Sequence, residues 1–464
     1  MTHSRRDVLK IAGTVGAAVG AGGSTAAATA ATAATAGAAA TAAADANAIV
    51  AAPVVAGVDL ATIPVVDSHL HPYKRTLIST QYRGQKDTFT AAVLPPGDYP
   101  EKQAVRARLL KGYEDLVWGV SRRTGYFNYV SRTYGVAPTM DGFDSVLKPH
   151  ITSDRAFIEY VRAMLDRANI ATLVVQSAEP EPVAPQYLAP AGRTVWTWPV
   201  SQMAEPEWAR QHGMTELSDV LAAVRKTLES AAGNGCRGFK NLSAYYRDFR
   251  LAPVTAEQAQ GALRALTKVE PTARREMGAL YYADPAIREQ VRIYQDYLFK
   301  QIYIAAGKLE RPIVIHSAAI LHPSLAIRNN DPLPLYDVFM DPDIVRAGTT
   351  FVLIHGGFPN QGEIASFISQ LPNVYVDVSH LAKYPAVLEE TYRALLQAGP
   401  AYKVMHGSDS GGVPDETGYC AWNSRQALAR ILTEYKSYYA WRPSDIESIA
   451  RGVLHDNAAR FYGI

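Results

Sequence analysis

Eight short runs of β-branched and apolar residues are the feature that most constrains how this chain can fold. Longer stretches with apolar residues at every third or fourth position separate them, as in 154–168, 216–232 and 287–306. Strand patterns that alternate with helical patterns indicate repeated βα units and a parallel sheet. Eight such units in one chain predict a closed (β/α)8 barrel of the TIM type rather than an open sheet. The predicted strands are 65–71, 172–176, 194–199, 237–242, 312–317, 350–355, 374–379 and 403–408.

A long insertion separates the first two predicted strands. Residues 74–149 contain one predicted helix, 102–122, followed by many aromatic residues. In a barrel of this type the active site lies at the carboxyl ends of the strands, so an insertion after strand one is placed to form a lid or a substrate wall. We therefore expect the insertion to lie over the mouth of the barrel.

The first 52 residues differ from the rest. Arg5 and Arg6 precede a mild apolar stretch, 11–19, and then a long segment of Ala, Gly and Thr. This start resembles a twin-arginine (Tat) signal peptide. A basic, flexible tail is the alternative, and the apolar stretch is shorter than the roughly 20 residues that span a bilayer. We expect Tat export to the periplasm or medium, cleavage between Ala26 and Ala52, no stable membrane insertion afterwards, and one folded domain over 53–464.

The charge balance bears on the kind of partner. The chain has 46 basic and 44 acidic residues, and its body has no Lys/Arg run, so the electrostatic footprint of a nucleic-acid-binding protein is missing. A small molecule is the expected partner. The two cysteines, Cys236 and Cys420, lack the spacing of a zinc or redox pair, and the sequence leaves open whether they form a disulfide.

Histidines and an aspartate stand where predicted strands end. His69 and His71 end the first strand, and the two-residue period of a strand puts both imidazoles on one face. Such a pair alone is as typical of ordinary polar residues as of metal ligands. His316 and His355 end the fifth and sixth strands, and Asp409 follows the eighth. Imidazoles and a carboxylate that converge at one open site are typical of zinc and related ions.

This ordered set resembles the amidohydrolase superfamily, in its amidohydrolase-related branch. The end of the chain, 457–463, also resembles that family's closing N-A-x-x-x-[FY]-G pattern. The resemblance implies a barrel that holds one or two divalent metal ions, for which we expect zinc. It also implies that His69, His71, His316, His355 and Asp409 are the ligands, and that Asp409 is the catalytic residue that moves protons to and from water.

Lys240 falls near the end of the fourth strand, where metal-bridging members of the superfamily carry a carboxylated lysine. Cations and apolar neighbours favour the neutral amine, which is the form that captures carbon dioxide. The carbamate would make Lys240 a metal ligand and would favour two ions. An ammonium that pairs with an anionic substrate, or a lysine that extends along the rim, remain alternatives.

Three further residues are predicted to bind substrate. Tyr246 and Arg247 lie in a segment that resembles the A-Y-R segment of relatives of glutamine-synthetase-fused amidohydrolases. Arg247 suits a substrate carboxylate because its guanidinium can hold one bidentately, and a salt bridge with a nearby acid such as Asp248 is the alternative. His322 lies in the loop after the fifth strand, whereas His380 and His406 are not assigned to the site.

The resemblance implies a metal-dependent hydrolase that cleaves a C–N bond, of the amide type, in a small carboxylate-bearing molecule. Two alternatives stay open. One is a zinc-dependent, non-oxidative decarboxylase of the same superfamily, although Lys240 argues against it. The other is an exported binding protein that has kept the barrel without turnover.

Overall fold

The fold is seen in a computed structural model, which describes residues 53–81, 84, 94, 99–117, 120–177, 189–190, 192–271, 273–274, 280–319, 325 and 327–464. The predicted export signal, within 1–52, lies outside these residues, so its cleavage stays a prediction. Among the described helices, none is both long and apolar enough to cross a membrane.

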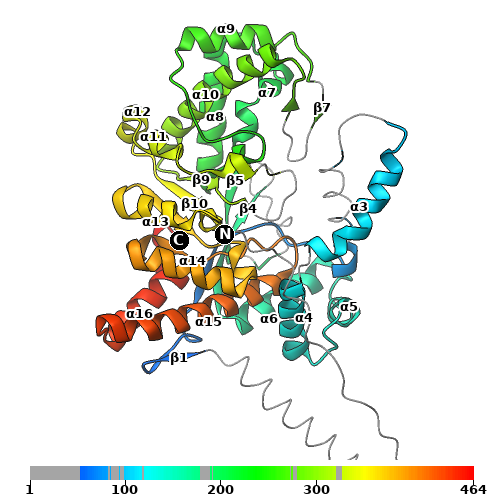
Figure 1. Ribbon diagram of the computed structural model, residues 1–464, viewed down its shortest axis with the longest axis vertical. Coiled ribbons are helices and arrows are strands. Elements are labelled where there is room, and N and C mark those ends of the chain that lie inside the picture. The colour runs from blue at the N-terminus through cyan, green and yellow to red at the C-terminus, as the bar shows by residue number, and fades with distance from the viewer. Residues whose placement is uncertain are drawn as a thin grey trace, which may run out of the picture. The chain divides into compact units, whose positions relative to one another are not determined.

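All eight predicted strands are confirmed, and they form one parallel sheet (Figure 1). The strands are β3 (Val65–Leu70), β4 (Ile170–Gln176), β5 (Thr194–Pro199), β6 (Cys236–Asn241), β9 (Ile313–His316), β10 (Phe351–Ile354), β11 (Val374–Asp377) and β12 (Val404–Met405). Their spatial order follows the chain from β3 to β12, so each strand pairs with the next one in sequence. Helices separate most of them, which gives the predicted (β/α)8 barrel.

The first and last strands close the barrel through a few backbone hydrogen bonds. Ser68 N–H donates to the carbonyl of His406 at 3.0 Å, and Asp409 N–H donates to the carbonyl of His69 at 2.7 Å. Two of the predicted metal ligands therefore lie on opposite sides of this seam, and the seam itself fixes their backbones relative to each other.

The interior of the barrel has an apolar layer below the polar strand ends. It is made by residues of five strands and of the last helix, α17 (Asn457–Tyr462): Val66, Val174, Val314, Val352, Ile354, Met405, Ala458 and Tyr462. His316 follows Val314 by two residues on the same strand, so both side chains face the interior. The polar residues at the strand ends therefore lie directly above a layer of packed apolar side chains.

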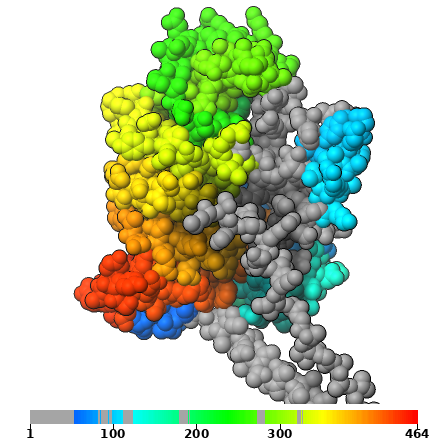
Figure 2. Space-filling view, in the orientation of Figure 1, coloured from blue at the N-terminus to red at the C-terminus, as the bar shows by residue number. Residues whose placement is uncertain are grey.

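The helices between the strands are amphipathic, as predicted. In α6 (Asp154–Arg167) the apolar residues Phe157, Val161 and Leu165 are buried. Ser153 caps this helix, because its side chain accepts a hydrogen bond from Ala156 N–H at 3.2 Å. The helices after β4 are α7 (Pro206–Gln211), α8 (Leu217–Gly233), α9 (Ala256–Leu266), α10 (Pro285–Lys308), α11 (Leu335–Phe339), α12 (Pro342–Arg346), α13 (Gln361–Gln370), α14 (Pro385–Ala398), α15 (Pro414–Tyr439) and α16 (Pro443–Arg451). Figure 2 shows the yellow, orange and red segments of the C-terminal half as one continuous surface.

The insertion contains the predicted helix and two more. The predicted helix 102–122 is confirmed as α3 (Lys102–Val117), which ends five residues earlier than predicted, and α4 (Val120–Tyr134) and α5 (Met140–Leu147) follow in the aromatic-rich stretch. Lys74 N–H donates to Gly412 O at 2.9 Å, so the insertion begins at the mouth. Farther on, Tyr126 and Tyr129 of α4 pack on Tyr419 of α15, with ring centroids 5.7 Å apart in both pairs. The aromatic residues of α4 thus pack near the start of α15, which follows the loop that carries Asp409. That the insertion lies over the mouth stays a prediction.

Candidate metal centre

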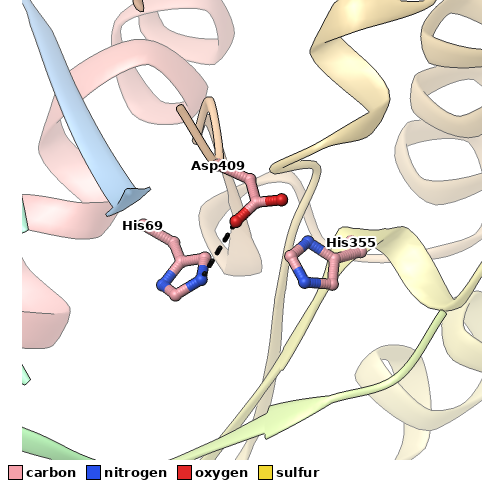
Figure 3. Close-up of side chains that lie close together, drawn as sticks. All are labelled: His69, His355 and Asp409. Atoms are coloured by element: carbon pink, nitrogen blue, oxygen red, sulfur yellow. Dashed lines mark ion pairs between the residues drawn. The ribbon is translucent and has the colours of Figure 1, made fainter. Parts of the chain in front are cut away.

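The structure brings the six predicted ligands to the carboxyl end of the barrel. His69 lies in β3, Lys240 in β6 and His316 in β9. His71 and His355 directly follow β3 and β10, and Asp409 lies four residues after the end of β12. One ligand atom each of His69, His355 and Asp409 lie within 4.8 Å of one another. Figure 3 shows these three side chains pointing toward a common space.

Asp409 is the centre of the group. Its Oδ1 lies 3.2 Å from Nε2 of His71 and 3.5 Å from Nε2 of His69, the contact dashed in Figure 3. The His69 residue is 1% exposed, whereas the side chain of His71 is 39% exposed. The pair predicted from the H-x-H motif therefore has one member inside the barrel and one at its opening.

One ring nitrogen of His316 and one of His355 face each other, and each carries a lone pair. Nε2 of His316 lies 3.0 Å from the carbonyl of Ala318, and Nδ1 of His355 lies 3.1 Å from the carbonyl of Ser379. A carbonyl only accepts, so these two nitrogens carry the protons of the neutral rings. The remaining nitrogens, Nδ1 of His316 and Nε2 of His355, lie 3.1 Å apart and both present lone pairs. Two lone pairs that face each other repel, and a cation beside them would relieve that repulsion.

The electrostatics of the site keep the buried imidazoles of His69, His316 and His355 neutral and the carboxylate of Asp409 ionised. Burial, with the Lys240 charge second, lowers the pKa of His316 to about 3 and that of His69 well below its ordinary value. Burial alone would raise the pKa of Asp409, but Lys383, together with hydrogen bonds from His380 and His71, holds it well below 3.8. Neutral imidazoles and a carboxylate are the ligands that zinc prefers, so these residues fit a divalent metal.

Two residues outside the predicted ligand set, Ser379 and Asp377, orient the ring of His355. Ser379 Oγ lies 2.8 Å from Nδ1 of His355 and donates to Oδ1 of Asp377 at 2.5 Å, and Asp377 also accepts from the backbone N–H of His355. Outer partners of this kind fix the tautomer and the ring plane of a ligand histidine. The sequence did not point to Ser379 or Asp377 as site residues, although both lie at the end of the predicted seventh strand.

Three residues of the site adopt left-handed backbone conformations that non-glycine residues seldom adopt. The φ angles are 70° at His355, 65° at His380 and 52° at Asp409. Each follows the end of a strand, where the chain must turn sharply to leave the barrel. Strain of this kind is concentrated at functional sites, where the surrounding structure holds it in place.

Lys240 is fully enclosed by this group. The residue is 1% exposed, and its Nζ lies 3.4 Å from Nε2 of His69. Burial lowers the pKa of Lys240 from 10.5 to about 7, partly offset by Asp409 and Asp377. The alternative of a lysine extended along the rim is excluded by this burial, because the amine lies inside the barrel.

His380 is a site residue that the sequence analysis left unassigned. It follows β11, and its Nδ1 lies 2.7 Å from Oδ2 of Asp409. The two oxygens of Asp409 therefore contact different histidines: Oδ1 lies near His69 and His71, and Oδ2 lies near His380. The position of His380 just past a strand end could have indicated its place at the mouth.

Of the neighbouring tyrosines, Tyr245 reaches the predicted ligands. Its ring centroid lies 4.7 Å from that of His316, and burial together with the Asp409 charge raises the pKa of its hydroxyl. The hydroxyl of Tyr246 instead lies beside Glu205, which together with burial raises its pKa well above 10. The 3₁₀ turn Ser243–Tyr245 decides which of the two faces the site, and the two-residue period of a strand does not apply there.

The structure does not bring Arg247 into the cluster. Its guanidinium is 6% exposed and pairs with Asp296 of α10, while other donors reach the carbonyl of Arg250 and the side chain of Gln295. The predicted alternative partner, Asp248, pairs with Arg292 instead. The third predicted substrate residue, His322, lies outside the described residues.

Comparisons with known proteins agree with this geometry. The profile of a family described as amidohydrolase matches residues 222–464, which is more than half of the chain. A protein from Lactobacillus casei, provisionally assigned as a metal-dependent hydrolase, has a TM-score of 0.64 at 15% identity, over 87% of this chain and 96% of that one. A uronate isomerase from Thermotoga maritima has a TM-score of 0.59 at 12% identity, over 86% and 95% of the two chains.

A glucuronate isomerase from Caulobacter crescentus is similar to the same extent, with a TM-score of 0.58 at 13% identity over 87% of this chain and 91% of that one. At these identities the solved structures show the shared fold alone. None of the curated proteins matches the sequence. The family match and the barrel nevertheless agree: this chain belongs to the amidohydrolase family.

Proposed function

We propose that this protein is a metal-dependent hydrolase that cleaves a C–N bond of the amide type in a small molecule. The observation that carries the proposal is the convergence of neutral His69 and His355 with ionised Asp409 within 4.8 Å, at the carboxyl end of the barrel. When bound, a divalent metal supplies Lewis acidity that lowers the pKa of water toward about 7 and polarises a carbonyl. We expect zinc.

Asp409 is suited to move the proton. It is ionised, and its Oδ2 already has a hydrogen-bond partner in Nδ1 of His380 at 2.7 Å. Asp409 takes the proton of the attacking water and passes it to the leaving nitrogen, which needs that proton to depart as an amine. The sequence-based reason for an acidic substrate was Arg247, whose charge Asp296 already offsets, so an acidic group on the substrate stays a prediction.

The amine of Lys240 supports a centre with two ions. A lysine whose pKa is about 7 is largely neutral in mild base, and the neutral amine adds to the carbon of carbon dioxide and loses a proton to form a carbamate. The two carbamate oxygens would then add anionic ligands next to His69. Metal analysis should give about two ions per chain if Lys240 is carboxylated and one if it is not.

The experiment that tests the function joins metal content to a reaction screen. Purified protein is assayed with N-acyl amino acids and γ-glutamyl amides, and both amine release and carbon dioxide release are measured. We expect amine release that is lost after treatment with a chelator and restored by zinc. Release of carbon dioxide without amine would favour the decarboxylase alternative and overturn the hydrolase.

A matched pair of lysine variants tests the second ion. Lys240→Ala should lose one metal, with partial rescue by short carboxylic acids that replace the carbamate. Lys300→Ala, which removes a lysine paired with Asp341 on the outer helices, should keep the metal content of the wild type. A wild type with one tightly bound ion and an unchanged Lys240→Ala would contradict the binuclear centre and leave the hydrolase standing.

We also propose Tat-dependent export to the periplasm or medium. The support is the Arg5-Arg6 pair before a short apolar stretch at the start of the sequence. Exported protein should begin between Ala26 and Ala52 on N-terminal sequencing. Export that is unaffected by replacing both arginines with lysine would contradict this route.

A further inference from the structure

Lys383 is a buried cation next to the site that is not itself a predicted ligand. It ends the 3₁₀ turn Leu381–Lys383 that follows β11, and its side chain is 4% exposed. Its Nζ lies 2.6 Å from the backbone carbonyl of Asp409 and 3.3 Å from Oε2 of Glu416, in the first turn of α15. The lysine therefore connects the end of β12 to the start of the next helix.

Asp409 needs support at its backbone. Its φ of 52° lies in the left-handed region, which residues with a side chain seldom adopt. Its N–H donates to the carbonyl of His69, its C=O accepts from Lys383, and its Oδ2 contacts Nδ1 of His380. The amide, carbonyl and carboxylate of one residue are each held by a different partner, and two of these partners come from the segment 380–383.

That segment is itself anchored. Asn423 of α15 donates from Nδ2 to the carbonyl of Ala382 at 2.8 Å, and Lys383 N–H donates to the carbonyl of His380 at 3.1 Å. The ammonium of Lys383 is thus fixed by its own turn, by α15 and by Glu416. A group held this firmly can define the position of the peptide that it contacts.

We propose that Lys383 is a positioning residue that sets the angle at which the carboxylate of Asp409 meets the ligand atoms of His69 and His355. This inference rests on the proposed metal-dependent function. Charge alone makes the opposite prediction, because removing a cation near the site should favour the binding of another cation. Lys383 also lowers the pKa of Asp409, so zinc affinity is compared at a pH at which Asp409 is ionised in every variant. Weaker metal binding without the lysine under that condition indicates lost geometry.

Lys383→Met tests the inference, and the chain offers a matched control. Lys403 is also buried, and its Nζ likewise donates to backbone carbonyls, those of Ile368 and Leu371, but not at the metal centre. Zinc affinity is measured on chelator-treated protein by competition with a metal-binding dye, with no substrate present. We expect Lys383→Met to lose affinity by about 10- to 100-fold, as when other outer partners of ligands are lost. Lys403→Met should stay within about twofold of the wild type, as expected for a site without a shared partner.

Two further readouts separate positioning from general damage. Lys383→Arg keeps the charge and the donors and should bind zinc within a few-fold of the wild type. Hydrogen exchange of the amides of residues 409–412 should be faster in Lys383→Met and unchanged in Lys403→Met. If Lys383→Met does not fold, Lys383→Gln, which keeps a polar group beside Glu416, carries the same expectation.

The outcomes that overturn the inference are distinct from those that overturn the function. If the wild type binds zinc tightly and Lys383→Met binds it equally or more tightly, Lys383 does not position Asp409. The same holds if Lys383→Arg is as weak as Lys383→Met, or if Lys403→Met is equally impaired. A wild type that binds no divalent metal overturns the proposed function, and this inference with it.

Discussion

At the scale of single residues, Asp409 combines two roles that one substitution can separate. Asp409→Asn keeps the size and one oxygen while removing the base, so metal should be retained better than turnover. General acid–base assistance contributes roughly 10²- to 10⁴-fold, so the kcat of Asp409→Asn should fall by at least about 10²-fold. His69→Ala should instead lose metal and activity together, because it removes a ligand.

The measurement for this pair is kcat together with metal content, determined on the same preparation. A fully metal-loaded Asp409→Asn that keeps more than about a tenth of the wild-type kcat would be incompatible with a lost general base. His69→Ala controls for the simpler explanation that any change among the ligands empties the site.

Two neighbouring tyrosines allow a second matched comparison. The raised pKa keeps the Tyr245 hydroxyl protonated at neutral pH, so it is a neutral hydrogen-bond donor beside His316. Tyr245→Phe should lower kcat/KM by about 10-fold with metal content unchanged, which corresponds to one lost hydrogen bond. Tyr246→Phe changes a hydroxyl that lies beside Glu205 and should leave kcat/KM within about twofold. Equal effects of the two variants on kcat/KM would remove Tyr245 from the site.

What could be predicted at this scale follows from strand geometry. His69, His316, His355 and Asp409 could be predicted because they stand at the ends of apolar runs, and the carboxyl ends of barrel strands converge. Tyr245 could not be told from Tyr246, because a 3₁₀ turn rather than a strand sets their directions. His380 reaches Asp409 because its backbone adopts a left-handed conformation, and no local sequence pattern predicts that conformation.

At the scale of elements, Arg247 joins the loop after β6 to α10. Its partner Asp296 is 1% exposed on its side chain and also accepts from the backbone N–H of Ala252 at 3.0 Å. Breaking a buried pair by removing one partner costs about 3–5 kcal/mol when the other charge is left without compensation. Here Nε of Arg292 also lies 3.3 Å from Oδ1 of Asp296 and compensates part of its charge. Arg247→Met should therefore lower the free energy of unfolding by less than this full cost.

Urea unfolding of Arg247→Met, of Asp296→Leu and of the double variant measures this cost. The double variant should recover part of the stability, because replacing both buried charges removes the desolvation penalty of each. If Arg247→Met kept the stability of the wild type and raised KM for acidic substrates only, Arg247 would be the substrate residue that the sequence suggested.

This pairing shows why the sequence could not identify the partner of Arg247. Asp248 is next to Arg247 in the chain, yet the actual partner lies 49 positions away on a helix whose orientation depends on the whole barrel. The insertion shows the same limit: the aromatic residues of α4 pack on α15, which lies almost 300 residues later in the chain. Local patterns predicted the elements, but only the closed barrel decides which of them touch.

At the scale of the whole molecule, metal binding should be coupled to stability. A ligand present at 100 times its Kd stabilises the folded protein by about 2.7 kcal/mol, which for a chain of this size raises Tm on the order of 3 °C. Zinc added to chelator-treated wild type should produce such a shift in a thermal scan, and His69→Ala should not respond. Identical melting of the wild type with and without zinc would contradict a site that exists only in the folded state.

The seam between β3 and β12 also has a consequence for how the protein comes to hold metal. His69 and Asp409 are 340 positions apart in the chain, yet the N–H of one donates to the carbonyl of the other across the seam. A ribosome-bound chain must therefore be extended past Asp409 before the two sides of the site can meet. Fragments that end before β12 should be unable to assemble it, and metal loading should report that the chain has been extended past the seam and has folded.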